Sequence, residues 1–259
     1  MKKRFLIKLV LLLAVIPSPV LFAKGAESPD ALWESANSAY TAGDYLEAIA
    51  RYDSISAQGY ASARLYYNMG NAYYKDNQIG KAILYYHKAL RLDPGNDDIK
   101  HNLATANTFV RDRIETVPEF FLKTWARELM YRAGTDSWAV MSLIFFAAAL
   151  ALVLLYLLGN RMAQRKTGFY GAIVFLLFSI GSLVFASIER RKILHPDEAV
   201  IMITAAPVKS EPNNASKDVF VLHEGTKVRI SAALGDWREV VVANGSRGWI
   251  EVKSIELID

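Results

Sequence analysis

The chain has 259 residues, no cysteine, and 30 Lys and Arg against 26 Asp and Glu, which gives a formal net charge of +4. The absence of cysteine excludes disulfides, thiol nucleophiles, iron–sulfur clusters and cysteine-ligated zinc. Residues 1–23 contain four Lys or Arg and no acid, so without them the net charge is zero. The remainder has no clustered excess of cations of the kind that binds nucleic acid.

Residues 1–23 have the order of a secretory signal peptide. Basic residues flank an apolar run at 9–16, two prolines break that run, and Ala23 supplies a small residue for cleavage. The apolar run is too short for a convincing membrane span. We expect cleavage after Ala23; cleavage after Ala26 and retention as an anchor are the alternatives.

Residues 28–115 are predicted to form an all-α repeat array. Small, polar and aromatic residues recur every 34 residues: Ala36, Asn37, Tyr40, Ala48, Ile49 and Tyr52 correspond to Gly70, Asn71, Tyr74, Ala82, Ile83 and Tyr86. This period and these residue types resemble the tetratricopeptide repeat (TPR) family. A third copy begins at Asp97 and loses the pattern after Asn107, so we expect a capping helix there.

The TPR resemblance implies that ligands bind the concave face formed by the first helix of each repeat. Asparagines on that face can hydrogen-bond the backbone of an extended peptide, and aromatic rings supply buried contact area. For Trp33 and Tyr67, packing within the repeats is an equally weighted alternative. Asp98 and Asn102 stand where a carboxylate clamp needs cations, so we expect no carboxylate-terminal ligand. The candidate protein-binding residues are Trp33, Asn37, Tyr40, Arg64, Tyr67, Asn71, Tyr74 and Lys75.

Residues 116–136 are predicted to form an amphipathic juxtamembrane segment. Phe121, Trp125 and Leu129 are spaced by four residues, which places them on one side of a helix. The segment rests either on the membrane surface or against the repeats, and the pattern fits both arrangements.

Two uncharged apolar runs predict a transmembrane hairpin, with spans at 137–158 and 169–189. At about 1.5 Å rise per residue, each span is long enough to cross a hydrocarbon core of about 30 Å. The connecting loop at 159–168 carries three Lys or Arg and no acid, which places it in the cytoplasm. Basic residues after the second span favour the opposite orientation, but the signal peptide exports the N-terminal region. We therefore expect both folded regions on the outer, periplasmic side of a bacterial inner membrane.

After a linker at 190–198, residues 199–259 change to short β-rich runs with period two. Three glycine-containing turns, at 222–228, 235–237 and 245–250, resemble the bacterial SH3-like (SH3b) family. The resemblance implies a small all-β barrel with tight turns at its glycines and Trp249 in the core. Trp237 is the candidate ligand-face residue, because we expect it beside the long loop at 206–217.

The sequence contains no pattern typical of an active site. The four histidines lack metal-ligand spacing, and no HExxH motif, phosphate-binding glycine loop or nucleophile elbow occurs. The two predicted spans carry no ionisable residue in their apolar runs, which argues against an ion pathway. We expect no enzymatic activity, no cofactor and no metal.

The order of signal peptide, TPR array, two-span hairpin and SH3b domain resembles the BatE-type proteins of the Bacteroides aerotolerance (Bat) group. That resemblance implies a scaffold in an envelope complex linked to oxidative-stress tolerance. The implied partners are other Bat-type membrane proteins with von Willebrand A domains and, indirectly, a MoxR-type ATPase. The alternative is a cell-wall sensor or tether that binds murein peptide through the SH3b domain.

Overall fold

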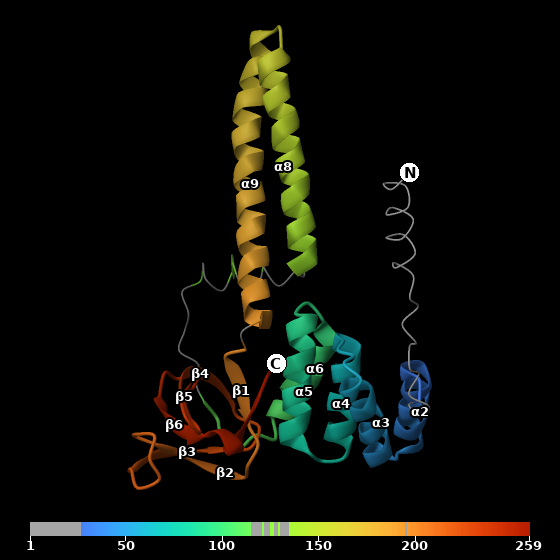
Figure 1. The fold of residues 1–259 in the computed structure, drawn as a ribbon, viewed down its shortest axis with the longest axis vertical. Coiled ribbons are helices and arrows are strands. Elements are labelled where there is room, and N and C mark those ends of the chain that lie inside the picture. The colour runs from blue at the N-terminus through green and yellow to red at the C-terminus, as the bar shows by residue number, and fades with distance from the viewer. Residues whose placement is uncertain (1–26, 115–120, 122–124, 127–128, 130–134, 195) are drawn as a thin grey trace, which may run out of the picture.

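The computed structural model describes residues 27–114, 121, 125–126, 129, 135–194 and 196–259. The predicted signal peptide and most of the predicted amphipathic segment at 116–136 lie outside these described residues. The described chain forms a helical array, a long helical hairpin and an antiparallel sheet domain (Figure 1). The predicted fold class is confirmed.

The helical array contains antiparallel helix pairs. Its helices are α2 Pro29–Ala42, α3 Tyr45–Ala57, α4 Ala63–Lys75, α5 Ile79–Leu92 and α6 Asp97–Asn107. Helix α2 pairs with α3, and α4 pairs with α5, while α6 packs against α5 and contacts α4. Helix α6 therefore occupies the position expected of a terminal helix that covers the last pair.

Close packing between α4 and α5 depends on a glycine. A Cβ atom on Gly70 would lie 2.6 Å from the ring of Tyr86, which is 1% exposed. The ring is held within the array, so the missing side chain at Gly70 is what lets the two helices approach. The buried alanines Ala36, Ala48 and Ala82 extend the same small-residue packing to both helix pairs.

The hairpin consists of α8 Thr135–Leu158 and α9 Met162–Leu194. Two segments, Asp136–Leu158 and Met162–Ile188, are long and apolar enough to cross a membrane by length and composition. The buried hydroxyls of Ser142 and Ser179 join the helices, because each donates to the other residue's carbonyl oxygen at 2.9 Å.

Helix α9 is longer than the predicted span at both ends. It begins at Met162, so most of the predicted 159–168 loop is helical, and it continues through much of the predicted linker at 190–198. An apolar run indicates only which part of a helix is apolar enough to lie in a membrane. The helix itself can continue beyond that run until a residue such as proline ends it. Pro196 follows shortly after the last helical residue, and a proline lacks the N–H that a helix interior needs.

The sheet domain contains seven antiparallel strands in the order β3-β2-β6-β5-β4-β1-β7. They are β1 Glu198–Ile201, β2 Ala205–Lys209, β3 Asp218–His223, β4 Lys227–Leu234, β5 Trp237–Val241, β6 Arg247–Glu251 and β7 Ile255–Leu257, with a 3-10 turn at Val252–Ser254. Buried side chains from most of the strands, including Val208, Leu222, Val228, Val240 and Ile250, form its core.

Trp249 does not belong to that core as expected. Gly248 and Ile250 are buried, so alternation along β6 turns Trp249 to the opposite face, where it is half-buried. A Cβ atom on Gly248 would lie 2.6 Å from Val208, so the glycine provides room for the neighbouring strand. The Trp249 side chain therefore lies on the outer surface of the sheet.

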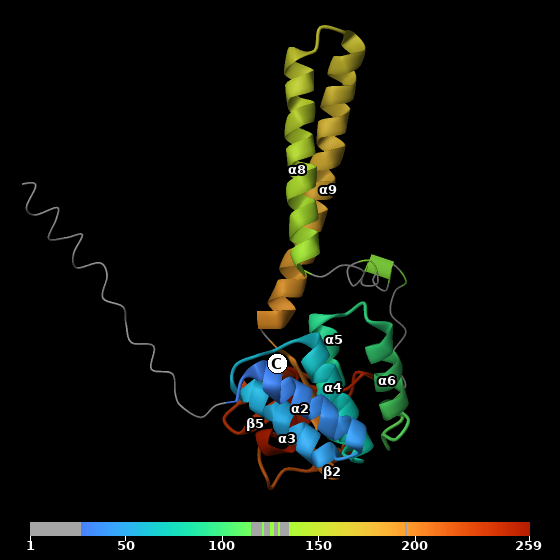
Figure 2. The same ribbon diagram turned by 90° about the vertical axis from the view of Figure 1, so that its right-hand side faces the viewer.

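The sheet domain lies beside the helical array, with α5 as the helix facing it (Figure 1). The hairpin extends away from both, and its connecting turn is at the far end (Figures 1 and 2). Both ends of the hairpin thus emerge next to the folded domains.

Candidate functional site

The candidate TPR residues lie on the surface formed by α2, α4 and α6, here called the first-helix face. Arg64 and Lys75 are exposed, and the other candidates are half-buried. The first-helix face places Tyr40 near Tyr67: burial raises the pKa of Tyr40, and the neighbouring Tyr45 and Tyr67 raise it further. The predicted residues from two repeats therefore share one surface.

Two asparagine–tyrosine–asparagine trios connect the helices beneath this face. In each trio, the carbonyl oxygen of the first asparagine accepts a hydrogen bond from the tyrosine hydroxyl, at 2.7 and 2.8 Å respectively. The same oxygen accepts a second bond from an amide on the next first helix, at 3.4 and 2.9 Å. The trios are Asn37, Tyr52 and Asn68, and Asn71, Tyr86 and Asn102, each residue being 34 positions from its counterpart.

These trios give Asn37 and Asn71 a structural role that the sequence reasoning missed. Their carbonyl oxygens are already engaged, but among the described residues neither amide nitrogen donates a hydrogen bond. An asparagine carries two amide donors in addition to its acceptor. Each side chain can therefore hold the repeats together and still donate to a ligand. Recurrence of Tyr52 and Tyr86 at the same 34-residue interval was the available signal.

Trp33 and Tyr67 make packing contacts within the array. The Trp33 ring meets Tyr52 edge-on at 5.7 Å, and the Arg64 guanidinium lies 4.9 Å from the Trp33 ring centre. The Tyr67 hydroxyl accepts a hydrogen bond from Asn102 at 3.0 Å. Both residues remain half-buried, so packing and ligand contact are compatible at these positions.

Phe109 is a further aromatic residue beside the first-helix face. Its ring meets Tyr74 edge-on at 5.9 Å and is 61% exposed. The sequence pattern ends at Asn107, so the repeat alignment did not single this residue out. The only signal in the sequence was an aromatic residue just after the predicted capping helix. It extends the aromatic surface beyond Tyr74.

The second candidate region is the outer surface of strands β5 and β6. Trp237 is half-buried, and it lies opposite Glu251 on one side and opposite Leu234 on the other. Trp249 faces the same side and lies opposite Lys209, the last residue of β2. The loop predicted at 206–217 is therefore wrong over its first residues, which belong to β2, and the rest of the loop begins next to Trp249 rather than beside Trp237.

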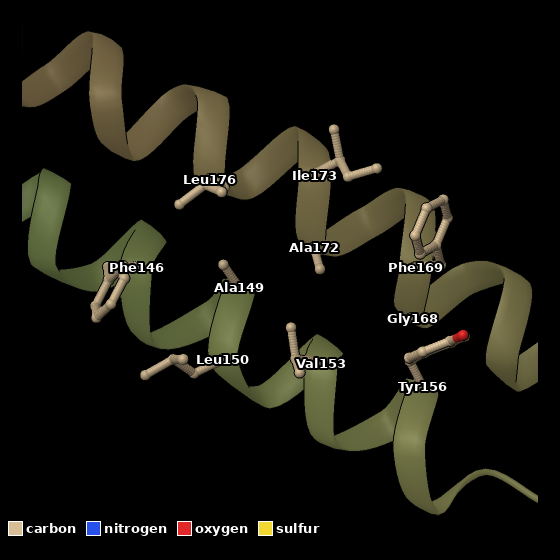
Figure 3. Close-up of a pocket in the computed structure, with 10 residues that line it drawn as sticks. All are labelled: Phe146, Ala149, Leu150, Val153, Tyr156, Gly168, Phe169, Ala172, Ile173 and Leu176. Carbon is tan, nitrogen blue, oxygen red and sulfur yellow. The ribbon is translucent and has the colours of Figure 1, made fainter.

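The hairpin contains an apolar groove of about 320 Å³ between α8 and α9 (Figure 3). Ala149 and Ala172 point toward the opposite helix, whereas Leu150 and Ile173 point away (Figure 3). Apart from the Tyr156 hydroxyl, its lining supplies no polar side chain. The lining residues are Phe146, Ala149, Leu150, Val153, Tyr156, Gly168, Phe169, Ala172, Ile173 and Leu176.

Within the part of the chain that the structure describes, no three His, Cys, Asp or Glu side chains gather in a way that could hold a metal ion. The expectation that the protein has no enzymatic activity stays a prediction.

Two regions match known families. Residues 63–96 match the tetratricopeptide repeat, and residues 204–256 match the bacterial SH3 domain. The first match spans α4, α5 and the turn that follows, and the second spans β2 to the start of β7. The resemblance to these two families is confirmed. A search of curated proteins finds no match to the chain.

Proposed function

We propose that the protein is a membrane-anchored adaptor whose first-helix face binds a protein partner. The TPR match supports this function, because stacked repeats of this kind form extended binding surfaces. The observation that carries the proposal concerns the side-chain amide nitrogens of Asn37 and Asn71, which donate no hydrogen bond to any described residue. The two groups lie one repeat apart and are bordered by half-buried tyrosines. Such donors suit the backbone carbonyls of an extended peptide.

In this proposal, the hairpin crosses the inner membrane and both folded domains lie on the periplasmic side. Arg161, Arg165 and Lys166 support a cytoplasmic position for the turn between α8 and α9. Protease added to spheroplasts should digest both end domains. Protection of either domain would contradict this topology.

The proposed partners are Bat-type membrane proteins with von Willebrand A domains and, through them, a MoxR-type ATPase. The order of TPR array, hairpin and SH3-like domain supports this assignment. The adaptor would then support an envelope complex linked to oxidative-stress tolerance, without enzymatic activity or a cofactor of its own.

The sharpest test replaces both asparagines by aspartate. Aspartate retains an acceptor for Tyr52 or Tyr86 but removes the amide donors, so the repeats stay connected while ligand donation is lost. At about 1 kcal/mol per net hydrogen bond, the double variant should weaken partner binding about tenfold or more. The measurement is the partner recovered by affinity purification of the full chain from native membranes in mild detergent.

Asn214→Asp is the matched control, because it makes the same chemical change at an exposed residue of the sheet domain. It should recover the partner as the wild type does. If the folded Asn37→Asp, Asn71→Asp variant also recovers the same partner in full, the first-helix face is not the binding surface.

The alternative function is attachment to murein peptide through the SH3-like domain. The bacterial SH3 match and the half-buried Trp237 on the outer sheet surface favour it. Detergent-solubilised full chain should then sediment with purified murein, and a folded Trp237→Ala variant should not. Equal recovery of the variant, or no sedimentation of the wild type, would count against this alternative.

A further inference from the structure

Helix α5 begins differently from the other helices of the array. Helices α2, α3, α4 and α6 each start with a side chain that accepts a hydrogen bond from the first turn: Ser28, Asp44, Ser62 and Asn96. The corresponding residue of α5, Gln78, makes no side-chain capping hydrogen bond. Unpaired amide groups at a helix start need an acceptor.

That acceptor comes from the sheet domain. Glu224, in the turn between β3 and β4, accepts a hydrogen bond from the backbone N–H of Gly80 at 3.3 Å across 144 residues of sequence. A Cβ atom on Gly80 would lie 2.6 Å from the Glu224 side chain, so the glycine leaves the space that the carboxylate uses. A carboxylate is also the charge that the start of a helix favours.

The same turn fits closely against the helices at its next residue. Gly225 is buried and has a φ of +86°. A Cβ atom there would lie 3.0 Å from Ile83 of α5 and 2.9 Å from Val110. The β3–β4 turn thus contacts α5 through its backbone, which requires that the two surfaces match in shape.

Asp112, which follows α6, fixes the other side of this turn. Its carboxylate accepts hydrogen bonds from the His223 backbone N–H and the Thr226 hydroxyl, both at 2.7 Å, and lies 2.6 Å from His223 Nδ1. Burial by itself raises the pKa of Asp112, but the bonds from Thr226 and His223 outweigh it and lower that pKa. The folded arrangement therefore favours the charged carboxylate.

A third set of contacts joins α5 to the C-terminus. Lys88 forms an ion pair with Asp259, and Arg91 donates a hydrogen bond to the carbonyl oxygen of Ile258. Ile258 and Val200 are buried in the same hydrophobic cluster as the cores of the helix pairs. Polar and apolar contacts thus run from the start of α5 to its last turn.

We infer that the outer side of α5 is the docking surface for the chain's own SH3-like domain, and that the docked domain braces the second repeat. One side of α5 carries Gly80, Lys88 and Arg91 against the sheet domain. Its other side carries Tyr86, which holds Asn71 of the first-helix face. The position of the sheet domain thereby sets the position of Tyr86 and of the hydrogen bond that it donates to Asn71. The inference stands whether or not the first-helix face binds a partner.

Hydrogen exchange on the full chain in detergent tests the brace. Asp112→Ala removes the acceptor of both His223 and Thr226, and should accelerate exchange about tenfold in the amides of α5 as well as in the 223–226 turn. Asp218→Ala is the control, because it removes an ion pair with Lys209 inside the sheet domain. The control should leave α5 unchanged.

A second variant should change the exchange rate of the α5 amides in opposite directions, depending on whether the two domains are coupled or independent. Gly80→Leu improves the helix propensity of α5, so independent domains predict slower exchange in that helix. A braced α5 loses Glu224 and its fitted surface, so exchange should instead accelerate. If α5 amides exchange more slowly in Gly80→Leu, or only the 223–226 turn responds to Asp112→Ala, the brace is overturned.

Discussion

The Asn71, Tyr86 and Asn102 trio allows a quantitative test, because each substitution removes a defined part of it. Tyr86→Phe deletes one hydroxyl at a residue that is 1% exposed, and leaves Asn71 with its 2.9 Å bond from Asn102. One net hydrogen bond is therefore lost without an orphaned acceptor. The free energy of unfolding should fall by about 1 kcal/mol.

Asn71→Ala should cost more than Tyr86→Phe. It leaves the buried Tyr86 hydroxyl without its acceptor, and it leaves the Asn102 amide with only its bond to the Tyr67 hydroxyl, so the loss should reach about 2–3 kcal/mol. Asn71→Asp keeps that acceptor and should cost the least of the three. Urea unfolding of the full chain in detergent, followed by circular dichroism at 222 nm, measures the series.

The equivalent residue Tyr52, also 1% exposed, provides an internal comparison. Because Tyr52→Phe removes the same bond one repeat earlier, its cost should be similar. If Asn71→Ala is no more destabilising than Tyr86→Phe, the trio does not hold the helices together and the reasoning is refuted.

Three further predictions concern packing, pH and the hairpin. Gly70→Ala should lower the free energy of unfolding by about 1–3 kcal/mol in the same urea assay, because its Cβ meets the Tyr86 ring; equal or greater stability would contradict this. The depressed pKa of Asp112 means that its stabilisation is complete above the unfolded value of about 3.9 and is lost as the pH falls through the folded value. Protection of the amides in the 223–226 turn, taken relative to the intrinsic exchange rate at each pH, should therefore fall in that acidic window in wild type, and Asp112→Ala should show no such fall. Replacing Ser142 and Ser179 together by alanine should weaken contact between the two hairpin helices by about 1 kcal/mol. Fluorescence energy transfer between labels on the two helices measures this change. If the variant and the wild type lose transfer equally on mild denaturation, these hydroxyls have no role in the contact.

The general architecture was predictable because each part repeats a local physical pattern. A 34-residue recurrence of small and aromatic residues indicates paired helices, uncharged runs indicate spans, and period two indicates strands. Orientation of Trp249 was open to the same reasoning, since Gly248 and Ile250 alternate around it. The family resemblance implies a core position for Trp249, and alternation along β6 shows that this expectation is wrong.

The contacts between the two domains were not predictable from local pattern. Glu224 and Gly80 are separated by 144 residues and Asp112 and His223 by 111. Neither pair has a spacing that repeats or a motif that marks it. The one local hint was the start of α5, where Gln78 stands in place of a strong capping residue. A missing cap identifies a need, but it does not reveal which distant residue meets it.

The length of α9 has a consequence for how far from the bilayer the protein works. If the second span ends at Ile188, the six remaining helical residues extend about 9 Å beyond it. Only residues 195–197 separate that extension from β1, which contacts α5. The span, the sheet and the helices beside it are therefore joined by a connection of only three residues. A connection of three residues limits how far the folded domains can lie from the end of the second span.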